Sequence, residues 1–149
     1  MTVQTPLGTM YLESDGTALV RACFVEQTNT GTSETDEIEQ LAAQQLGEYF
    51  CGHRTEFTVP LKPSGTPFQR AVWEQLSRIP YGRTASYGEI AAAIGKPQAA
   101  RAVGAACGNN PIWIFLPCHR VIGKNGALTG YAGGTARKQW LLDWEHGTV

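Results

Sequence analysis

The 149-residue chain lacks several features that would place it in a membrane, outside the cell or around a metal. Its apolar run Ile112–Pro117 is far shorter than the roughly 20 residues that cross a bilayer, so we expect no membrane partner. Its N-terminus lacks the basic start and apolar stretch of a secretory signal, which favours a cytoplasmic protein with reduced thiols. The four cysteines form no C-x-x-C pair and no cluster with histidine, so we expect no metal.

The composition is that of a folded chain. The sequence is 42% hydrophobic and 17% charged, which excludes a disordered polymer. It has 17 glycines and 8 prolines without a repeat, which excludes collagen-like or linker character. A chain of this length is near the size of one typical domain and can bury a core.

The net charge of −1 hides two halves of opposite sign. Residues 1–61 carry two basic residues against nine acidic ones, a net charge of −7, and residues 62–149 carry ten against four, a net charge of +6. A basic segment is typical of a site for a polyanion such as nucleic acid. A solvated basic face without a partner explains the charge equally well, so charge alone leaves both interpretations open.

Residues 1–61 predict a small α/β domain. Alternation through Thr9–Glu13 and Ala18–Val25, around an Asp15-Gly16 turn, predicts two strands of a short sheet. Apolar residues then recur at helical spacing from Ile38 to Phe50. The extended, proline-punctuated segment Phe57–Pro63 coincides with the change of charge, so we place the domain boundary between residues 61 and 62.

Residues 62–149 predict a mostly helical domain, and hence an α+β protein. Thr66 is suited to cap a helix whose apolar stripe runs from Phe68 to Ile79. Ser86 and Glu89 form a capping box that starts a second helix, which should end at Gly95. Another helix is expected over residues 99–107, and two short helices joined by a tight turn indicate a helix-turn-helix.

The helix over residues 99–107 is rich in alanine, and Arg101 is its only long side chain. Small side chains would let it pack closely inside the protein. They would also let a slim basic helix approach a nucleic-acid groove, the interpretation that we favour.

The segment before Cys118 is the most informative part of the chain. Ile112–Leu116 predicts a short buried strand that leads into Pro117-Cys118-His119-Arg120. A cysteine in this position can be merely a small core residue. However, the neighbouring imidazole and guanidinium groups would favour the nucleophilic thiolate. Adjacent side chains of an extended segment point to opposite faces, so we expect a bridging water between Cys118 and His119, with Glu145 orienting the imidazole.

A glycine-rich stretch, Gly123–Gly134, follows and contains Tyr131. It matches no phosphate-binding loop pattern. It could let the backbone approach a flat ligand while Tyr131 packs on it, or it could be an ordinary surface turn. Thr135 is then expected to cap a final helix that Trp140, Leu141 and Trp144 anchor to the core.

These segments together resemble a known family. The motifs GTPFQRAVWEQL, IPYGRTASYGEIA, RAVG-x-A-x-x-x-NP, PCHRVIG and LTGYAGG, from about Gly65 to Glu145, closely resemble the O6-alkylguanine-DNA alkyltransferases. Residues 1–61 are similar only in pattern, as the small N-terminal domain of that family.

The resemblance implies a reaction and its partners. The alkyl group of O6-alkylguanine in double-stranded DNA would move in line to Cys118, with O4-alkylthymine as a further candidate substrate. The product is a thioether, which offers water no carbonyl to attack, so the protein is consumed after one event. The protein is expected to act as a monomer without cofactor or metal.

The resemblance also assigns roles to residues. His119 would remove the Cys118 proton through water with the help of Glu145, and Tyr87 would donate a proton or hydrogen bond to the departing guanine. The target nucleotide must leave the stack, and Arg101 would fill the space that it vacates. The small residues of that helix would line the minor groove: Ala102, Gly104 and Ala105.

Further residues are expected around the substrate pocket. Backbone carbonyls of Cys118 and Val121, together with Tyr131, would read the guanine, and Asn110 would brace the active-site turn. The rest of the expected pocket consists of Cys107, Trp113 and Ala132. Cys107 is either a second alkylation site or a wall of the pocket, and Ala132 replaces a serine found in some relatives.

Two other functions remain open. A helix-turn-helix regulator or damage-recognition protein would bind DNA with its thiols intact, and relatives of that kind replace the acceptor cysteine. A cysteine hydrolase would turn over many times.

Overall fold

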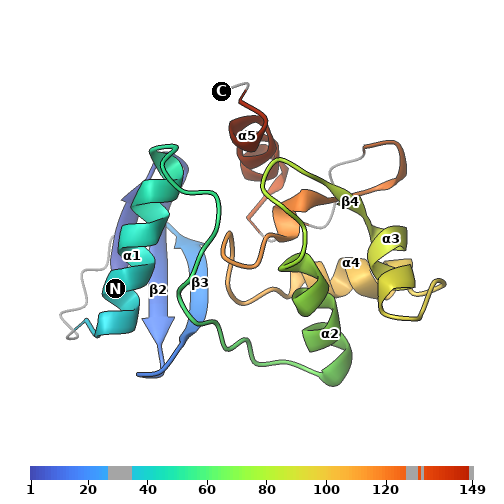
Figure 1. Ribbon diagram of the computed structural model, residues 1–149, viewed down its shortest axis with the longest axis horizontal. Coiled ribbons are helices and arrows are strands. Elements are labelled where there is room, and N and C mark those ends of the chain that lie inside the picture. The colour runs from blue at the N-terminus through green and yellow to red at the C-terminus, as the bar shows by residue number, and fades with distance from the viewer. Residues whose placement is uncertain (27–34, 127–130, 132, 148–149) are drawn as a thin grey trace. The chain divides into compact units, whose positions relative to one another are not determined.

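The computed structural model describes residues 1–26, 35–126, 131 and 133–147 (Figure 1). The chain forms two compact units, one made of Met1–Ser64 with Pro111–Phe115 and the other of Gly65–Asn110 with Leu116–Val149. The α+β class agrees with the prediction, as does an N-terminal part with a sheet followed by a mostly helical part. The five residues 111–115, which the expected division assigns to the second domain, belong to the first unit.

The first unit is a three-stranded sheet covered by one helix (Figure 1). Strands β1 (Thr2–Thr5), β2 (Gly8–Ser14) and β3 (Leu19–Val25) are antiparallel and adjacent in sequence order. Helix α1 (Glu37–Phe50) starts at Asp36, whose carboxylate accepts a hydrogen bond from the Glu39 amide at 2.7 Å. The two predicted strands and the helix are confirmed, and β1 was not predicted. The core consists of Met10, Leu12, Leu19, Ala22, Ala42, Leu46 and Tyr49.

The predicted strand Ile112–Leu116 is wrong. Ile112 forms only an isolated parallel bridge with Ala22, beside which the Trp113 amide donates to the Ala22 carbonyl at 2.8 Å. Ile114 then adopts a left-handed conformation with φ of 74°, which a β-branched residue rarely accepts. The chain therefore turns instead of extending, while Ile112, Ile114 and Phe115 remain buried.

The second unit begins with three helices, the first two of which start at the predicted caps, although α2 ends at Leu76, before the expected Ile79. Helix α2 (Pro67–Leu76) has Thr66 as its N-cap, in a capping box with Gln69. Helix α3 (Tyr87–Ala93) starts with the predicted box of Ser86 and Glu89. Helix α4 (Ala100–Gly108) follows after a short turn and completes the helix-turn-helix. It is joined to α2 by a buried hydrogen bond from the Trp73 indole to the Ala106 carbonyl, 2.9 Å long.

The rest of the second unit contains Cys118. Strand β4 (Ala85–Ser86) pairs in parallel with β5 (Val121–Ile122), and the short 3-10 helix η1 (Cys118–Arg120) directly precedes β5. A second 3-10 turn, η2 (Lys124–Gly126), and helix α5 (Thr135–Glu145) follow. The N-cap of α5 is Gly134, at φ of 92°. The predicted cap Thr135 is instead the first residue of the helix, and no side chain caps this end.

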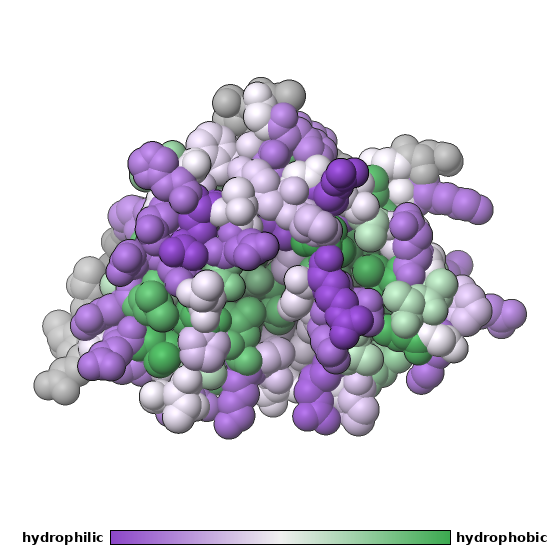
Figure 2. Space-filling model, in the orientation of Figure 1, coloured by the Kyte–Doolittle hydropathy of each residue, from purple (hydrophilic) through white to green (hydrophobic). Residues whose placement is uncertain are grey.

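The surface seen in Figure 2 is mostly hydrophilic, with hydrophobic side chains visible in patches between polar ones. Among the described residues, no helix is long and apolar enough to span a membrane.

Candidate active site

Cys118 lies at the start of η1, and its side chain is almost completely buried, with the residue 2% exposed. Its sulfur accepts a hydrogen bond from Nδ2 of Asn110 at 3.1 Å. The same amide nitrogen donates to the Leu116 carbonyl at 2.9 Å. Asn110, which directly follows α4 and its C-cap Asn109, therefore holds both the sulfur and the backbone that leads to it.

The expectation of an ionised Cys118 thiol is wrong for the free protein. Burial raises the pKa of Cys118 to about 11, and the Asn110 hydrogen bond and the Lys138 charge offset only part of this effect. The expected extended backbone is wrong as well, because Cys118–Arg120 is helical. A thiol that holds its proton needs a base before it can act as a nucleophile.

The expected contribution of the Arg120 guanidinium to the thiolate is also wrong, because Arg120 is bound to Glu145 in a bidentate ion pair. Nε and Nη2 of Arg120 donate to the two Glu145 oxygens at 2.8 and 2.9 Å, and Nη1 donates to the Ile79 carbonyl at 2.8 Å. Burial would raise the pKa of Glu145, but hydrogen bonds from His119 and Arg120 outweigh it and hold that pKa well below its ordinary value.

Glu145 also fixes the tautomer of His119. Nε2 of His119 lies 2.7 Å from Oε2 of Glu145, and both side chains are buried. Burial lowers the pKa of His119 below its ordinary 6.5, so the imidazole is neutral near pH 7. Because an ionised carboxylate only accepts hydrogen bonds, the imidazole proton must sit on Nε2. This leaves Nδ1 with a basic lone pair, and Nδ1 is buried without a hydrogen-bond partner among the described residues.

A buried lysine, Lys138, lies beside Tyr87 and acts electrostatically on Cys118. Nζ of Lys138 donates to the Val121 carbonyl at 2.5 Å and lies 3.5 Å from the Tyr87 hydroxyl. The Lys138 charge lowers the pKa of Cys118. Lys138 is therefore a cation that favours the thiolate, the role that the sequence analysis gave to the neighbouring imidazole and guanidinium. It also occupies the Val121 carbonyl, which was expected to read the guanine.

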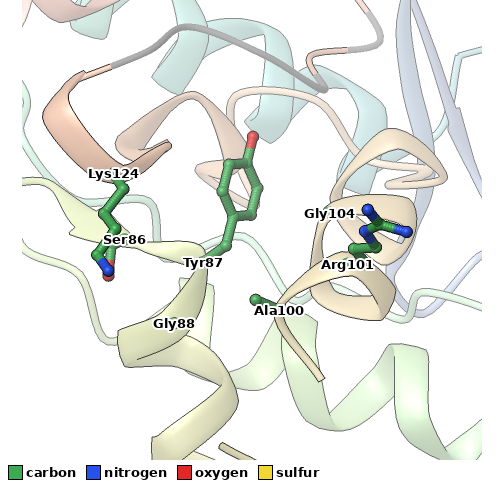
Figure 3. Close-up of a pocket in the computed structure, with 7 residues that line it drawn as sticks. All are labelled: Ser86, Tyr87, Gly88, Ala100, Arg101, Gly104 and Lys124. Carbon is green, nitrogen blue, oxygen red and sulfur yellow. The ribbon is translucent and has the colours of Figure 1, made fainter. Parts of the chain in front are cut away.

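A pocket of about 590 Å³ opens beside Tyr87, a volume typical of small-molecule sites (Figure 3). In this view the Tyr87 ring stands between Lys124 on one side and the α4 residues Arg101 and Gly104 on the other. A Cβ atom at Gly104 would lie 3.8 Å from the Tyr87 ring, so the glycine keeps this wall open. The lining residues are Ser86, Tyr87, Gly88, Ala100, Arg101, Gly104 and Lys124.

The small residues of α4 lie on both faces of the helix. Arg101, Ala102 and Ala105 are exposed, and Gly104 is half-buried. The buried residues are Val103, Ala106 and Cys107. Close internal packing therefore explains Ala106 but not Ala102 and Ala105, which leave a shallow exposed surface around Arg101.

The remaining predicted pocket residues have different fates. Tyr131 itself is buried, with 8% of it exposed. A Cβ atom at Gly133 would lie 2.6 Å from that ring, which shows why glycine is needed there. Trp113 belongs to the first unit, where its ring lies 5.8 Å from Phe24. Ala132 lies outside the described residues.

Two functional candidates were missed by the sequence analysis, Lys124 and Lys138. Lys138 could have been found from its spacing, because it shares one face of α5 with Leu141, Leu142 and Glu145, all buried. Of the predicted anchors, Leu141 is fully buried, and the half-buried Trp140 and Trp144 stack on each other with ring centroids 5.5 Å apart. Among the described residues, no group of three or more metal-ligating side chains is present.

The second unit thus combines a buried thiol, an adjacent buried His119–Glu145 pair and a helix-turn-helix whose second helix lines a pocket, a combination that fits a nucleophilic site in a DNA-binding protein. Two family models match the chain: the ribonuclease-like domain of 6-O-methylguanine DNA methyltransferase over residues 1–63, and its DNA binding domain over residues 67–147. The chain belongs to the 6-O-methylguanine DNA methyltransferase family.

Individual relatives are similar over nearly the whole chain. A methylated-DNA–protein-cysteine methyltransferase of Mycolicibacterium paratuberculosis is 51% identical over 97% of this chain and 90% of its own length. The constitutive enzyme of that name from Bacillus subtilis is 47% identical over 97% of this chain and 93% of its own. The crystal structure of a Mycobacterium tuberculosis protein in complex with DNA is 48% identical, covers 99% of this chain and 92% of that one, and has a TM-score of 0.90.

Proposed function

We propose that the protein repairs DNA by moving the alkyl group of O6-alkylguanine in duplex DNA irreversibly to the sulfur of Cys118. The observation that carries the proposal is the arrangement of Asn110, Cys118 and the His119–Glu145 pair in a single buried site. It is supported by relatives of 47 to 51% identity that are named methylated-DNA–protein-cysteine methyltransferases. The DNA binding domain model that spans the site supports DNA as the partner.

The chemistry starts with the removal of the Cys118 proton. Nδ1 of His119 accepts it through a bridging water, and the positive charge that forms on the imidazole is stabilised by Glu145. The sulfur then attacks the alkyl carbon as the bond from that carbon to guanine O6 breaks. The guanine leaves with the bonding electron pair and receives a hydrogen bond or proton from the Tyr87 hydroxyl.

The product explains why each molecule acts once. A thioether carbon has neither a carbonyl nor a good leaving group, so water does not release the alkyl group. The protein is then a stoichiometric reagent and not a turnover enzyme.

DNA must deliver the base to a thiol that is almost completely buried. We propose that the nucleotide is flipped into the pocket beside Tyr87, at a cost of a few kcal/mol. Arg101 is exposed at the start of α4 and lines the same pocket, which suits it to fill the vacated stack. The exposed Ala102 and Ala105 allow α4 to lie in the minor groove, and we propose that one monomer is sufficient.

The test is a stoichiometric transfer assay with peptide mass spectrometry. Excess duplex with one O6-methylguanine should add one methyl group per protein, on the peptide that contains Cys118, and a parallel duplex with O4-methylthymine tests the second substrate. Cys118→Ala should bind the duplex but accept nothing, whereas Cys51→Ala, which removes an exposed thiol, should behave as wild type. Binding without modification would identify a damage-recognition protein, and repeated turnover would identify a hydrolase.

A further inference from the structure

Lys124 is an exposed cation that the reaction described above does not use. It is the first residue of the η2 turn and comes two residues after Ile122, the register partner of Ser86 in the parallel pair of β4 and β5. Tyr87 directly follows Ser86. The strand pairing therefore brings the η2 turn beside Tyr87, and Lys124 and Tyr87 line the same pocket (Figure 3).

Lys124 lines two pockets of different charge. The pocket of about 590 Å³ beside Tyr87 contains a second cation, Arg101, and its lining residues in the described part of the chain include no carboxylate. The other pocket, of about 320 Å³, contains Glu89, whose carboxylate accepts a hydrogen bond from the Ser86 amide at 3.2 Å. An anion that binds Lys124 is therefore favoured on the side of the larger pocket.

Both cations of the larger pocket are available to a ligand. Arg101 and Lys124 are exposed, and within the described residues neither takes part in an ion pair. In Figure 3 they lie on opposite sides of the Tyr87 ring. Arg101 is assigned to the vacated base stack by the proposed function, which leaves Lys124 as the pocket cation for the DNA backbone.

The distribution of charge in this pocket fits a nucleotide. Between the two cations the lining residues are uncharged and include Tyr87, Gly88 and Gly104, which suits a flat, neutral base. An exposed lysine beside such a surface is a point charge that can bind phosphate. We propose that Lys124 binds a phosphodiester next to the flipped nucleotide, so that the target strand passes the pocket on the side opposite Arg101. This proposal rests on the proposed function.

A contact of this kind should affect binding and not the chemical step. The phosphate carries its charge before the base is flipped and throughout the transfer. Lys124 therefore binds the ground state and the transition state equally, which raises affinity without speeding the reaction. The contact also releases counterions from the DNA, so its loss should make binding less dependent on salt. This pattern differs from that of Arg101, whose loss should slow flipping.

The first test compares Lys124→Gln with the wild type on a duplex that contains one O6-methylguanine. At low salt the dissociation constant should rise by about fivefold, and the slope of log K against log salt should become shallower by about 0.9. The single-turnover rate at saturating duplex should stay within about twofold of wild type. Lys124→Arg should bind as wild type. Lys62→Gln, which removes an exposed lysine from the first unit, is the matched control and should also bind as wild type.

The second test locates the phosphate with duplexes that carry one neutral methylphosphonate linkage, on the 5′ or the 3′ side of the O6-methylguanine. At one of these two linkages the wild type should lose the affinity that Lys124→Gln has already lost, and the variant should lose nothing more. Such non-additivity identifies two groups in contact. A methylphosphonate at the end of the duplex is the control and should leave the difference between the two proteins unchanged.

Wild-type affinity and salt dependence for Lys124→Gln would overturn the proposal. A deficit of Lys124→Gln that persists in full on both flanking methylphosphonates would overturn it as well. Because Lys124 is exposed, the variant should unfold at the wild-type temperature, so that its loss of affinity reports the contact itself. If the wild-type protein binds the duplex but accepts no alkyl group, the proposed function fails, and the binding data still decide separately whether Lys124 contacts the phosphate.

Discussion

Nε2 of His119 lies 2.7 Å from Oε2 of Glu145, and the same carboxylate is held by two hydrogen bonds from Arg120. One side chain thus compensates a buried guanidinium and sets the tautomer of a buried imidazole. The stability of this unit and the basicity of Nδ1 are linked through Glu145, so changing that residue should affect both properties.

Glu145→Gln should destabilise the protein and slow the transfer. The amide leaves Arg120 buried without a counter-charge, which costs about 3–5 kcal/mol of the free energy of unfolding. It can also turn its NH₂ group toward His119, which favours the wrong tautomer and should slow the transfer at least tenfold. Denaturant unfolding and single-turnover kinetics measure the two effects, with Asp143→Asn on the same helix as the control.

The difference in stability should depend on pH. The pKa of Glu145 is lowered by folding, so the stability it contributes is present above its ordinary value of 4.5 and is lost as the pH falls toward the lowered value. The advantage of the wild type over Glu145→Gln should therefore be larger at pH 7 than at pH 3. An advantage that does not change with pH would contradict the lowered pKa.

The transfer rate should fall in acid, at a pH below the ordinary pKa of histidine. Because burial lowers the pKa of His119 below 6.5, the imidazole stays neutral and basic until the pH falls past that lowered value. The single-turnover rate at saturating DNA should thus be level around neutral pH and decline with a midpoint below 6.5. A midpoint above 6.5 would show that the imidazole is stabilised in its charged form.

Cys107 should not be a second acceptor. It is 1% exposed, and burial raises its pKa to about 12, above that of Cys118. His119 is the proposed base for Cys118, and in the described part of the chain no histidine is hydrogen-bonded to Cys107. Peptide mass spectrometry after reaction should find the alkyl group on Cys118 alone, and Cys107→Ala should still accept one group per molecule. An adduct on Cys107 would show that it is more than a wall.

Gly133→Ala should disturb the Tyr131 ring. The added Cβ would lie 2.6 Å from ring carbon Cε2, closer than side chains approach in folded proteins, so the ring or the backbone must move. We expect about 1–3 kcal/mol of destabilisation and a slower transfer. Gly47→Ala, where a Cβ meets nothing within 4 Å in the middle of α1, is the control and should be neutral or stabilising.

Arg101→Ala should slow flipping more than it weakens binding. Without the guanidinium nothing fills the vacated stack, so the transfer rate should fall at least tenfold on a fully paired duplex. The loss should be smaller when the alkylated base is mispaired, because less stacking and pairing energy must be overcome. Arg78→Ala, which removes another exposed cation of the same unit, should leave the rate unchanged. An equal loss on paired and mispaired duplexes would contradict a role in flipping.

The fold was predictable where local chemistry decides it. Capping by Thr66 and the Ser86–Glu89 box depends on residues within one turn, and both are present as expected. The predicted strand Ile112–Leu116 was wrong because an apolar run indicates burial but does not specify the backbone conformation. The segment is buried as predicted, yet Ile114 turns the chain. Thr135 failed as a cap because Gly134 at positive φ already starts α5.

The pairing of His119 with Glu145 was predictable from the sequence, and the electrostatics of the site were not. The motif around Cys118 brings His119 and Glu145 into one site, as the geometry now shows. Thiol ionisation depends on the burial of the sulfur and on which cation lies near it, and the residues adjacent in sequence reveal neither. Lys138 is 20 residues further along the chain, and only the packing of α5 brings its charge to Cys118.

The five residues 111–115 have a further consequence for how the molecule can be taken apart. The chain leaves the helical unit after Asn110, is hydrogen-bonded to Ala22 of β3, and returns at Leu116, two residues before Cys118. A fragment that starts near residue 64 would lack the first unit, in which Ile112 and Phe115 are buried. The segment that leads to Cys118 would then have no sheet to pack against. We therefore expect residues 111–115 to lose their fixed conformation when the first unit is absent.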